Sequence, residues 1–299
     1  MLHDSVAKRR SLKALAAELS AIAFLVPFLV PFLVFYVWPV VKGGWMSLHV
    51  WGVAGKQRFV GLDNYAKILR DDNFYANLWH SFYFVLIFVP LVIVFGLVLA
   101  LLVNRKMPMR ALFRSVYFLP YVLSVSIVCF IWMRMLDSGS GLVNSILAAF
   151  GLPGANWLTD PDWAWWSIAI TTVWWTVGFV MVLFLAGLQE IPVEFYEAAN
   201  IDGANSYQRF RHITLPGLSG VMRVQIFYQV IASLKLFGQV HIMTQGGPGD
   251  TTNTFVRYIY LTGFKKDLFG LASAQSLLFC LIMLIITAAQ YRFMNKRED

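Results

Sequence analysis

The 299-residue chain has little charge and little cysteine. Charged residues make up 13% of it and hydrophobic residues 59%, whereas about a quarter of an average soluble domain is charged. A water-soluble protein of this size could not cover so much apolar side chain with so little charge, so an ordinary soluble fold is excluded. The two cysteines, Cys129 and Cys280, both lie in apolar runs. A disulfide framework or a cysteine metal cluster is therefore not supported.

Motifs for nucleotide binding, metal binding and catalysis are also missing. No G-x-x-x-x-G-K-[ST] run occurs, so the chain cannot build a phosphate-binding P-loop. The glycine-rich residues 246–249 lack the following lysine and are better interpreted as a turn. The five histidines show no ligand spacing, and no Ser-His-Asp or Cys-His arrangement is found. We expect no metal site, no catalytic residue and no cofactor bound by this chain.

Long apolar blocks take the place of these motifs. Six blocks of 19 to 25 residues each match the length that an α-helix needs to cross ~30 Å of hydrocarbon. They predict an all-α integral membrane protein with six transmembrane helices, preceded by an N-terminal tail over residues 1–18; a large soluble all-α core is the alternative. The predicted spans cover residues 19–41, 82–103, 115–133, 164–188, 222–244 and 271–291.

The lysines and arginines that flank these blocks predict the orientation. Fourteen of them lie in the two tails and in the loops that follow the second and fourth spans, against eight in the other loops. Because cytoplasmic loops carry the excess of Lys and Arg, we expect both termini to be cytoplasmic. The net charge of +8 is then largely a topology signal, and nothing indicates nucleic acid as a partner.

The predicted cytoplasmic loop over residues 189–218 has the pattern of two short helices. Pro192 suits the first turn of a helix, and Glu194 complements the positive end of its dipole. Gly203 can end that helix in a left-handed conformation, and Asn205 or Ser206 can cap a second one. We expect the second helix to end at residues 215–216, which gives two helices joined at a glycine.

This loop resembles the EAA loop of binding-protein-dependent ABC permeases. The resemblance is carried by Glu197, Ala198, Ala199, Asp202, Gly203, Ala204, Phe210, Ile213, Leu215 and Pro216. In that family the loop forms coupling helices that dock into a cleft on a cytoplasmic ATPase, which implies that Glu197 and Gly203 are central to the joint. An amphipathic helix pair lying on the membrane surface is the alternative.

The similarity extends over nearly the whole chain and narrows to the carbohydrate group, the maltose- and glycerol-phosphate-type permeases. It is carried by residues 59–65, 118–120, 141–144 and 246–249, together with 251–264. The resemblance implies a type I ABC importer permease fold in residues 19–299, in a bacterial inner membrane. It also implies three partners besides membrane lipid: a second, homologous permease, a cytoplasmic ATPase dimer that uses ATP and Mg²⁺, and a periplasmic or lipid-anchored solute-binding protein.

Polar residues in the fifth predicted span point to the substrate path. If residues 222–244 form one helix, five polar side chains lie within about half of its circumference. They are Gln225, Gln229, Ser233, Lys235 and Gln239. Because polar residues in a membrane are unfavourable, such a stripe marks a cavity or hydrogen bonds between helices.

The resemblance adds further positions to this path. It implies substrate contacts from Gln229, Ser233 and Leu236 in the fifth span, and from Trp174, Gly178 and Met181 in the fourth. Trp174 or Trp175 could stack on a sugar face, and Gly178 would let a ring approach the backbone. The tryptophans are equally well explained as interface anchors or lipid-facing residues.

Lys235 departs from a purely neutral path. It lies ~20 Å from the cytoplasmic end of its predicted helix, where a bare ammonium is unfavourable. It can snorkel outward, pair with a carboxylate of the partner permease, or meet an anionic group on the substrate. The predicted function is thus import of a sugar or glycoside, including an anionic one. A secondary transporter or channel subunit for a polar solute is the alternative, although spans two to six contain no Asp or Glu.

Overall fold

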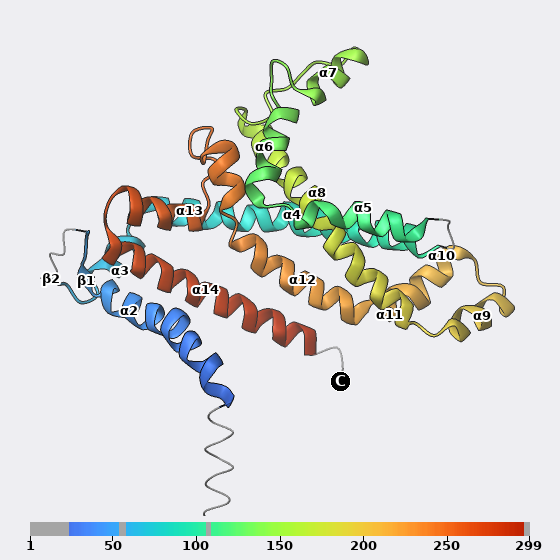
Figure 1. The fold of residues 1–299 in the computed structure, drawn as a ribbon, viewed down its shortest axis with the longest axis horizontal. Helices are drawn as coiled ribbons and strands as arrows, with labels where there is room; N and C mark the ends of the chain where they lie inside the picture. Colours follow the sequence, from blue (N-terminus) through green and yellow to red (C-terminus); the bar gives the residue numbers. More distant parts are fainter. Residues whose placement is uncertain (1–23, 54–57, 106–108, 296–299) are drawn as a thin grey trace, which may run out of the picture. The chain divides into compact units, whose positions relative to one another are not determined.

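The computed structural model describes residues 24–53, 58–105 and 109–295, which are almost entirely helical (Figure 1). The predicted tail over residues 1–18 and the start of the first predicted span lie outside the described residues. So do four other cations of the topology count, Lys56, Lys106, Lys296 and Arg297. The chain divides into two compact units, which are treated separately below.

The first unit comprises residues up to Ile68 together with Thr262–Leu278. A helix runs from Phe24 to Ser47 and includes the π-helical η1 (Leu33–Val37) and α2 (Trp38–Ser47). β1 (His49–Val50) pairs antiparallel with β2 (Arg58–Phe59), and α3 (Asp63–Leu69) follows. The Asn64 side chain donates to the carbonyl oxygens of Ser47 and His49, at 2.7 and 3.0 Å. The motif over residues 59–65 therefore fixes the turn after the first apolar helix.

The second unit comprises Leu69–Leu261 and the residues from Phe279 onward. Its helices up to the polar loop are α4 (Asp72–Asn104), α5 (Arg110–Val122), α6 (Val125–Met135), α7 (Leu142–Ala149) and α8 (Pro161–Glu190). The later ones are α9 (Val193–Ile201), α10 (Ser206–Arg209), η2 (Phe210–Thr214), α11 (Leu215–Gly217), α12 (Ser219–Leu234), η3 (Val240–Thr244) and α13 (Phe255–Tyr260). The helices η4 (Leu261–Lys265) and α14 (Phe269–Asn295) each have residues in both units.

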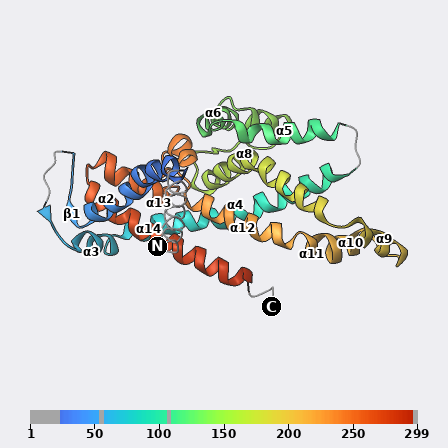
Figure 2. The ribbon, with the colours of Figure 1, turned by 60° about the horizontal axis from the view of Figure 1, so that its bottom comes forward.

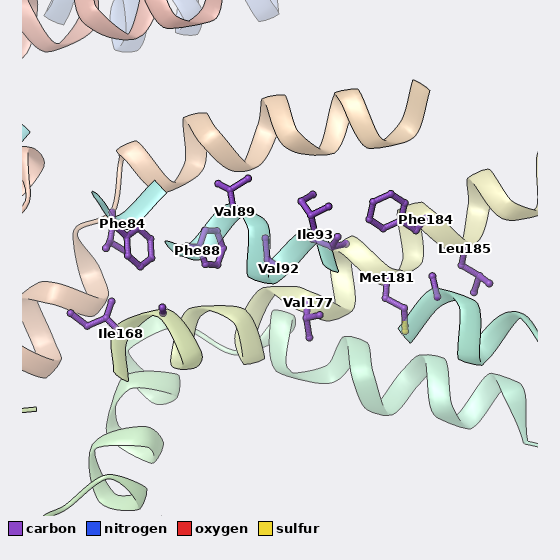
Figure 3. Packing of buried hydrophobic residues seen from close by; sticks show 14 of the residues in the cluster. Phe84, Phe88, Val89, Val92, Ile93, Ile168, Val177, Met181, Phe184 and Leu185 are labelled. Carbon is purple, nitrogen blue, oxygen red and sulfur yellow. The ribbon is translucent and has the colours of Figure 1, made fainter. Parts of the chain in front are cut away.

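The core of the second unit forms where α4 packs against α8, with α5 on α8 and α12 on α4 (Figure 2). Figure 3 shows Phe84, Phe88 and Val92 of α4 interleaved with Ile168 and other side chains of α8; all are buried. Each helix is preceded by an aspartate, Asp71 or Asp160, whose side chain caps it by accepting from a backbone N–H two residues later. Since lipid tails are as apolar as these side chains, close packing rather than water exclusion must hold the helices together.

Four described helices are long and apolar enough to cross a membrane. They are Phe24–Ser47, Asp72–Asn104, Pro161–Glu190 and Phe269–Arg292, and they coincide with the first, second, fourth and sixth predicted spans. The pattern of apolar blocks therefore located these helices, although α4 begins ten residues before the predicted span at residue 82. The number of six spans stays a prediction.

The third predicted span, residues 115–133, is not one straight helix. It falls on α5 and α6, which are bent by 100° at a short break. Leu123 and Ser124 adopt extended backbone there, and the Ser124 hydroxyl caps α6 by accepting from the Ile127 N–H at 3.4 Å. A local serine cap after Pro120 thus interrupts an apolar run whose hydropathy alone predicts continuity.

Candidate functional site

The fifth predicted span is also broken, and a cavity with polar side chains lies at the break. α12 ends at Leu234, and Lys235, Leu236 and Phe237 follow without helical structure. The Ser233 hydroxyl donates to the Gln229 carbonyl at 2.7 Å, and the Thr254 hydroxyl donates to the Leu236 carbonyl at 2.8 Å. Thr254 therefore satisfies an acceptor that a continuous helix would have paired within itself.

The break changes the predicted polar stripe. Gln225, Gln229 and Ser233 lie on α12 and are buried, as expected of one inward face. Lys235 and Gln239 lie beyond the end of α12, so the positions assigned to them on a continuous helix over residues 222–244 are wrong. The reason is tertiary: Gly238 packs against Val125 at the start of α6, and a Cβ there would come within 3.0 Å of a Val125 methyl.

A cavity of about 290 Å³ lies at this break, and we name it the break pocket. Its walls come from α4, α6, α8 and α12, together with the residues after α12. They are Phe84, Phe88, Val125, Thr172, Trp175, Thr176, Gln229, Ala232, Ser233, Lys235, Leu236, Phe237, Gly238 and Gln239. Five predicted path residues, Gln229, Ser233, Lys235, Leu236 and Gln239, are therefore brought together here.

The polar groups of the break pocket divide into satisfied hydroxyls and free amides. Ser233, Thr172 and Thr176 donate to backbone carbonyls one turn earlier in their own helices. The amides of Gln229 and Gln239 are 2% and 6% exposed and make no hydrogen bond to any described residue. Because buried amides are almost always hydrogen-bonded, these two are available for a ligand or for water.

Trp175, and not Trp174, supplies an aromatic wall to the break pocket. The Trp175 indole N–H donates to the Leu123 carbonyl at 3.1 Å, which anchors the ring at the break between α5 and α6. Trp174 packs edge-on against Trp132, with ring centroids 5.9 Å apart, in a separate apolar groove. The resemblance placed Trp174 on the substrate path, although either tryptophan could stack on a sugar face; Trp174 does not line the break pocket.

Three further predicted path residues lie outside the break pocket. A Cβ on Gly178 would come within 1.9 Å of the Tyr117 carbonyl oxygen, so Gly178 permits close contact between α8 and α5 and leaves no room there for a sugar ring. Met181 is fully buried between α4 and α8. Gln225 is buried with neither amide atom hydrogen-bonded, and it does not line the pocket.

Other lining residues of the break pocket were not predicted from the sequence. Thr172 and Thr176 lie one turn apart on α8 and line the cavity together with Gln229 and Ser233 of α12. Two threonines at i and i+4 in an apolar run are a polar signal of the same kind as the α12 stripe. The neighbouring tryptophans, Trp174 and Trp175, were chosen instead as the candidate sugar contacts in this run.

The polar segment over residues 191–218, named the elbow here, folds largely as its sequence predicts. Gly203 follows α9 with φ +77°, the left-handed conformation that glycine adopts without strain. Asn205 caps α10, and its side chain and that of Gln208 each accept from the other residue's backbone N–H. Pro216 does not end the second helix: it lies within α11, after the π-helical turn η2.

Hydrogen bonds brace the two arms of the elbow against each other. The hydroxyls of Tyr196 and Thr214 are 2.9 Å apart, and the Arg209 guanidinium donates to the Asn200 side chain. Phe210 lines a groove near the end of α4, together with Leu101 and Leu102. The elbow can therefore transmit a displacement as one rigid piece.

The outer surface of the elbow is apolar for so polar a segment. Ile201 is 87% exposed, and Phe195 and Val193 are also exposed. A concave pocket of about 690 Å³ lies beside α9. Of the predicted coupling residues, Ala198, Ala199 and Asp202 line it, Gly203 and Ala204 line a smaller adjoining one, and Glu197 is exposed. Large exposed apolar side chains rimmed by polar residues mark a surface that contacts another protein or the membrane.

Comparisons with known proteins identify the family of this chain. Residues 74–298 match the family model of the binding-protein-dependent transport system inner membrane component. The chain is 35% identical over 268 residues to a trehalose/maltose transport system permease protein, MalF, of Thermococcus litoralis, covering 89% of this chain and 90% of that one. It is 31% identical over 286 residues to a sulfoquinovosyl glycerol permease protein, SmoG, of Agrobacterium fabrum, covering 95% and 93%.

The fold is that of a solved permease chain. A chain in the crystal structure of a bacterial ABC transporter that imports the acidic polysaccharide alginate superimposes with a TM-score of 0.86 and 23% identity, covering 96% of this chain and 99% of that one. An alginate transporter crystallised with its alginate pentasaccharide-bound periplasmic protein gives 0.84 and 22%, covering 93% and 94%. The family match and the two relatives establish that this chain belongs to the inner membrane permease components of binding-protein-dependent ABC transporters.

Proposed function

We propose that this permease subunit moves a sugar or glycoside through the break pocket, from a periplasmic binding protein to the cytoplasm. The observation that carries the proposal is the pair of buried, unbonded amides of Gln229 and Gln239 in a cavity walled by Trp175. Amides can donate to and accept from sugar hydroxyls, and an indole ring can cover a sugar face. The named relatives that carry trehalose, maltose or sulfoquinovosyl glycerol support this substrate class.

The size of the break pocket fits one small ligand. Its volume of about 290 Å³ is at the lower end of small-molecule sites, which span ~300–1,000 Å³. Lys235 is exposed at its edge. A second, homologous permease facing this edge would enlarge the cavity and close it from lipid. The pocket is then one half of a site shared by two subunits.

The elbow is the proposed attachment to an ATPase dimer that supplies ATP-driven motion. Its exposed Phe195 and Ile201 suit a cleft on a partner protein better than water. Because the elbow is braced internally and continues into α8 and α12, a pull on it would move both walls of the break pocket. Alternating access would follow from that movement. The excess of cations near the tails and the elbow supports cytoplasmic termini in a bacterial inner membrane.

The test is ATP-dependent uptake into proteoliposomes that contain this chain, its second permease and its ATPase, with the binding protein outside. Trehalose, maltose, lactose and sulfoquinovosyl glycerol serve as radiolabelled probes. The proposal expects accumulation of at least one probe only when ATP, the ATPase and the binding protein are all present. Equal uptake without the ATPase would instead identify a secondary carrier.

A further inference from the structure

Lys235 is the one charged side chain that lines the break pocket. The lining contains no aspartate and no glutamate. Lys235 follows the 16 residues of α12, which places it ~24 Å along the helix axis from Ser219. This cation therefore lies at the exposed edge of the break pocket, far along the helix axis from the start of α12 and beside the hydrogen-bonding groups that the proposed function assigns to the substrate.

No described residue neutralises the Lys235 ammonium group. Within residues 24–53, 58–105 and 109–295 it forms no ion pair and no hydrogen bond. The carboxyl end of α12 provides a partial negative charge of ~0.5, which offsets part of the ammonium charge. A cation among membrane-spanning helices is unfavourable without a counter-charge, so a full counter-charge is expected.

The surroundings of Lys235 suit an anion carried by a sugar. The Gln229 amide lies on α12 before the break and the Gln239 amide lies after it, so Lys235 lies between two free amides along the chain. An ammonium group binds a carboxylate, sulfonate or phosphate, while the two amides are free for hydroxyl groups. A neutral sugar would leave the ammonium group without a counter-charge.

We propose that Lys235 binds the anionic group of an acidic glycoside in the break pocket and so selects acidic over neutral cargo. The inference rests on the proposed function, since it assumes that the break pocket lies on the substrate path. Once the proposed second permease covers this edge, charge pairing discriminates between ligands, because a neutral ligand leaves the ammonium charge unpaired.

The test compares methyl β-glucuronide with methyl β-glucoside, which differ only by a carboxylate in place of a hydroxymethyl group. Uptake of each is measured in proteoliposomes with wild type, Lys235→Gln and Lys235→Arg, with the same binding protein throughout. Lys265→Gln, which removes the same charge from an exposed residue outside the pocket, is the control. We expect Lys235→Gln to lower glucuronide uptake by about tenfold or more and to spare the glucoside. Lys235→Arg and Lys265→Gln should retain glucuronide uptake.

Other results would overturn the inference. Unchanged glucuronide uptake by Lys235→Gln, or wild-type uptake of the glucoside alone, would show that Lys235 binds no substrate anion. An equal fall for both probes, with loss of the second permease on purification, would show that Lys235 pairs with a carboxylate of that subunit. These results leave the proposed function intact, whereas absence of any ATP-dependent uptake by wild type would remove the proposed function and the inference with it.

Discussion

The elbow and the break pocket belong to the same unit but are built by different kinds of contact. The elbow is shaped by residues close in sequence: Asn205 and Gln208 cap each other's backbone, and Gly203 provides the turn between helices. The break pocket needs contacts between residues further apart in the chain: the Trp175 indole donates to the Leu123 carbonyl, 52 residues away, and Val125 packs against Gly238. Contacts between near residues hold the elbow in one shape. The break pocket is formed by several helices, so its shape changes when those helices move relative to one another.

This difference predicts that damage to the elbow abolishes energy coupling and leaves the break pocket intact. Ile201→Asp puts a charge at an apolar position that is 87% exposed and is expected to lie in the ATPase interface. Truncation of a central interface residue is unfavourable by ~2 kcal/mol or more, and a buried charge by more, so ATP-driven uptake should fall by about thirtyfold or more. Uptake and co-purification of the ATPase are the measurements.

Phe150→Asp is the matched control for the elbow variant, since Phe150 is 79% exposed just after α7, outside the elbow. It should leave ATPase binding and uptake near the wild-type level. Normal ATPase binding by Ile201→Asp, or equal losses in both variants, would contradict the assignment of the elbow as the coupling surface.

A second pair of variants separates the break pocket from ordinary burial on the same helix. Gln229→Leu removes a free amide from the pocket and should weaken substrate-stimulated uptake by about tenfold, through a higher KM. Gln225→Leu removes an amide of which neither atom is hydrogen-bonded, so it should raise the Tm and leave uptake unchanged. If the Gln225 variant lost uptake as severely, the path would have to extend beyond the break pocket.

The smallest expected effect concerns the turn in the elbow. Gly203→Ala places a Cβ at φ +77° in open space, so only backbone strain of ~1–2 kcal/mol opposes it. Gly220→Ala, in the first turn of α12 and equally open, should stabilise the helix by up to ~1 kcal/mol. Opposite shifts of Tm in the purified protein check both. A Tm unaffected by Gly203→Ala would mean that the elbow does not depend on the left-handed turn.

The same contrast explains what could be predicted from the sequence. Apolar blocks located the four long helices, and the residues of the elbow predicted its cap and its glycine turn, because each signal is local. The breaks at Ser124 and after Leu234 could not be predicted from hydropathy, because apolar residues continue on both sides of each break. Gly178 was assigned to the substrate path for a related reason. The sequence does not distinguish a glycine that allows close packing of α5 from one that allows a ligand to approach the backbone.

The most direct measurement is a cryo-EM structure of the assembled transporter, with a glycoside trapped by an ATPase variant that binds ATP without hydrolysing it. The account predicts ligand density within hydrogen-bonding distance of Gln229 and Gln239, with the elbow seated on the ATPase. Ligand density lined by other helices, or an elbow in contact with lipid alone, would contradict it.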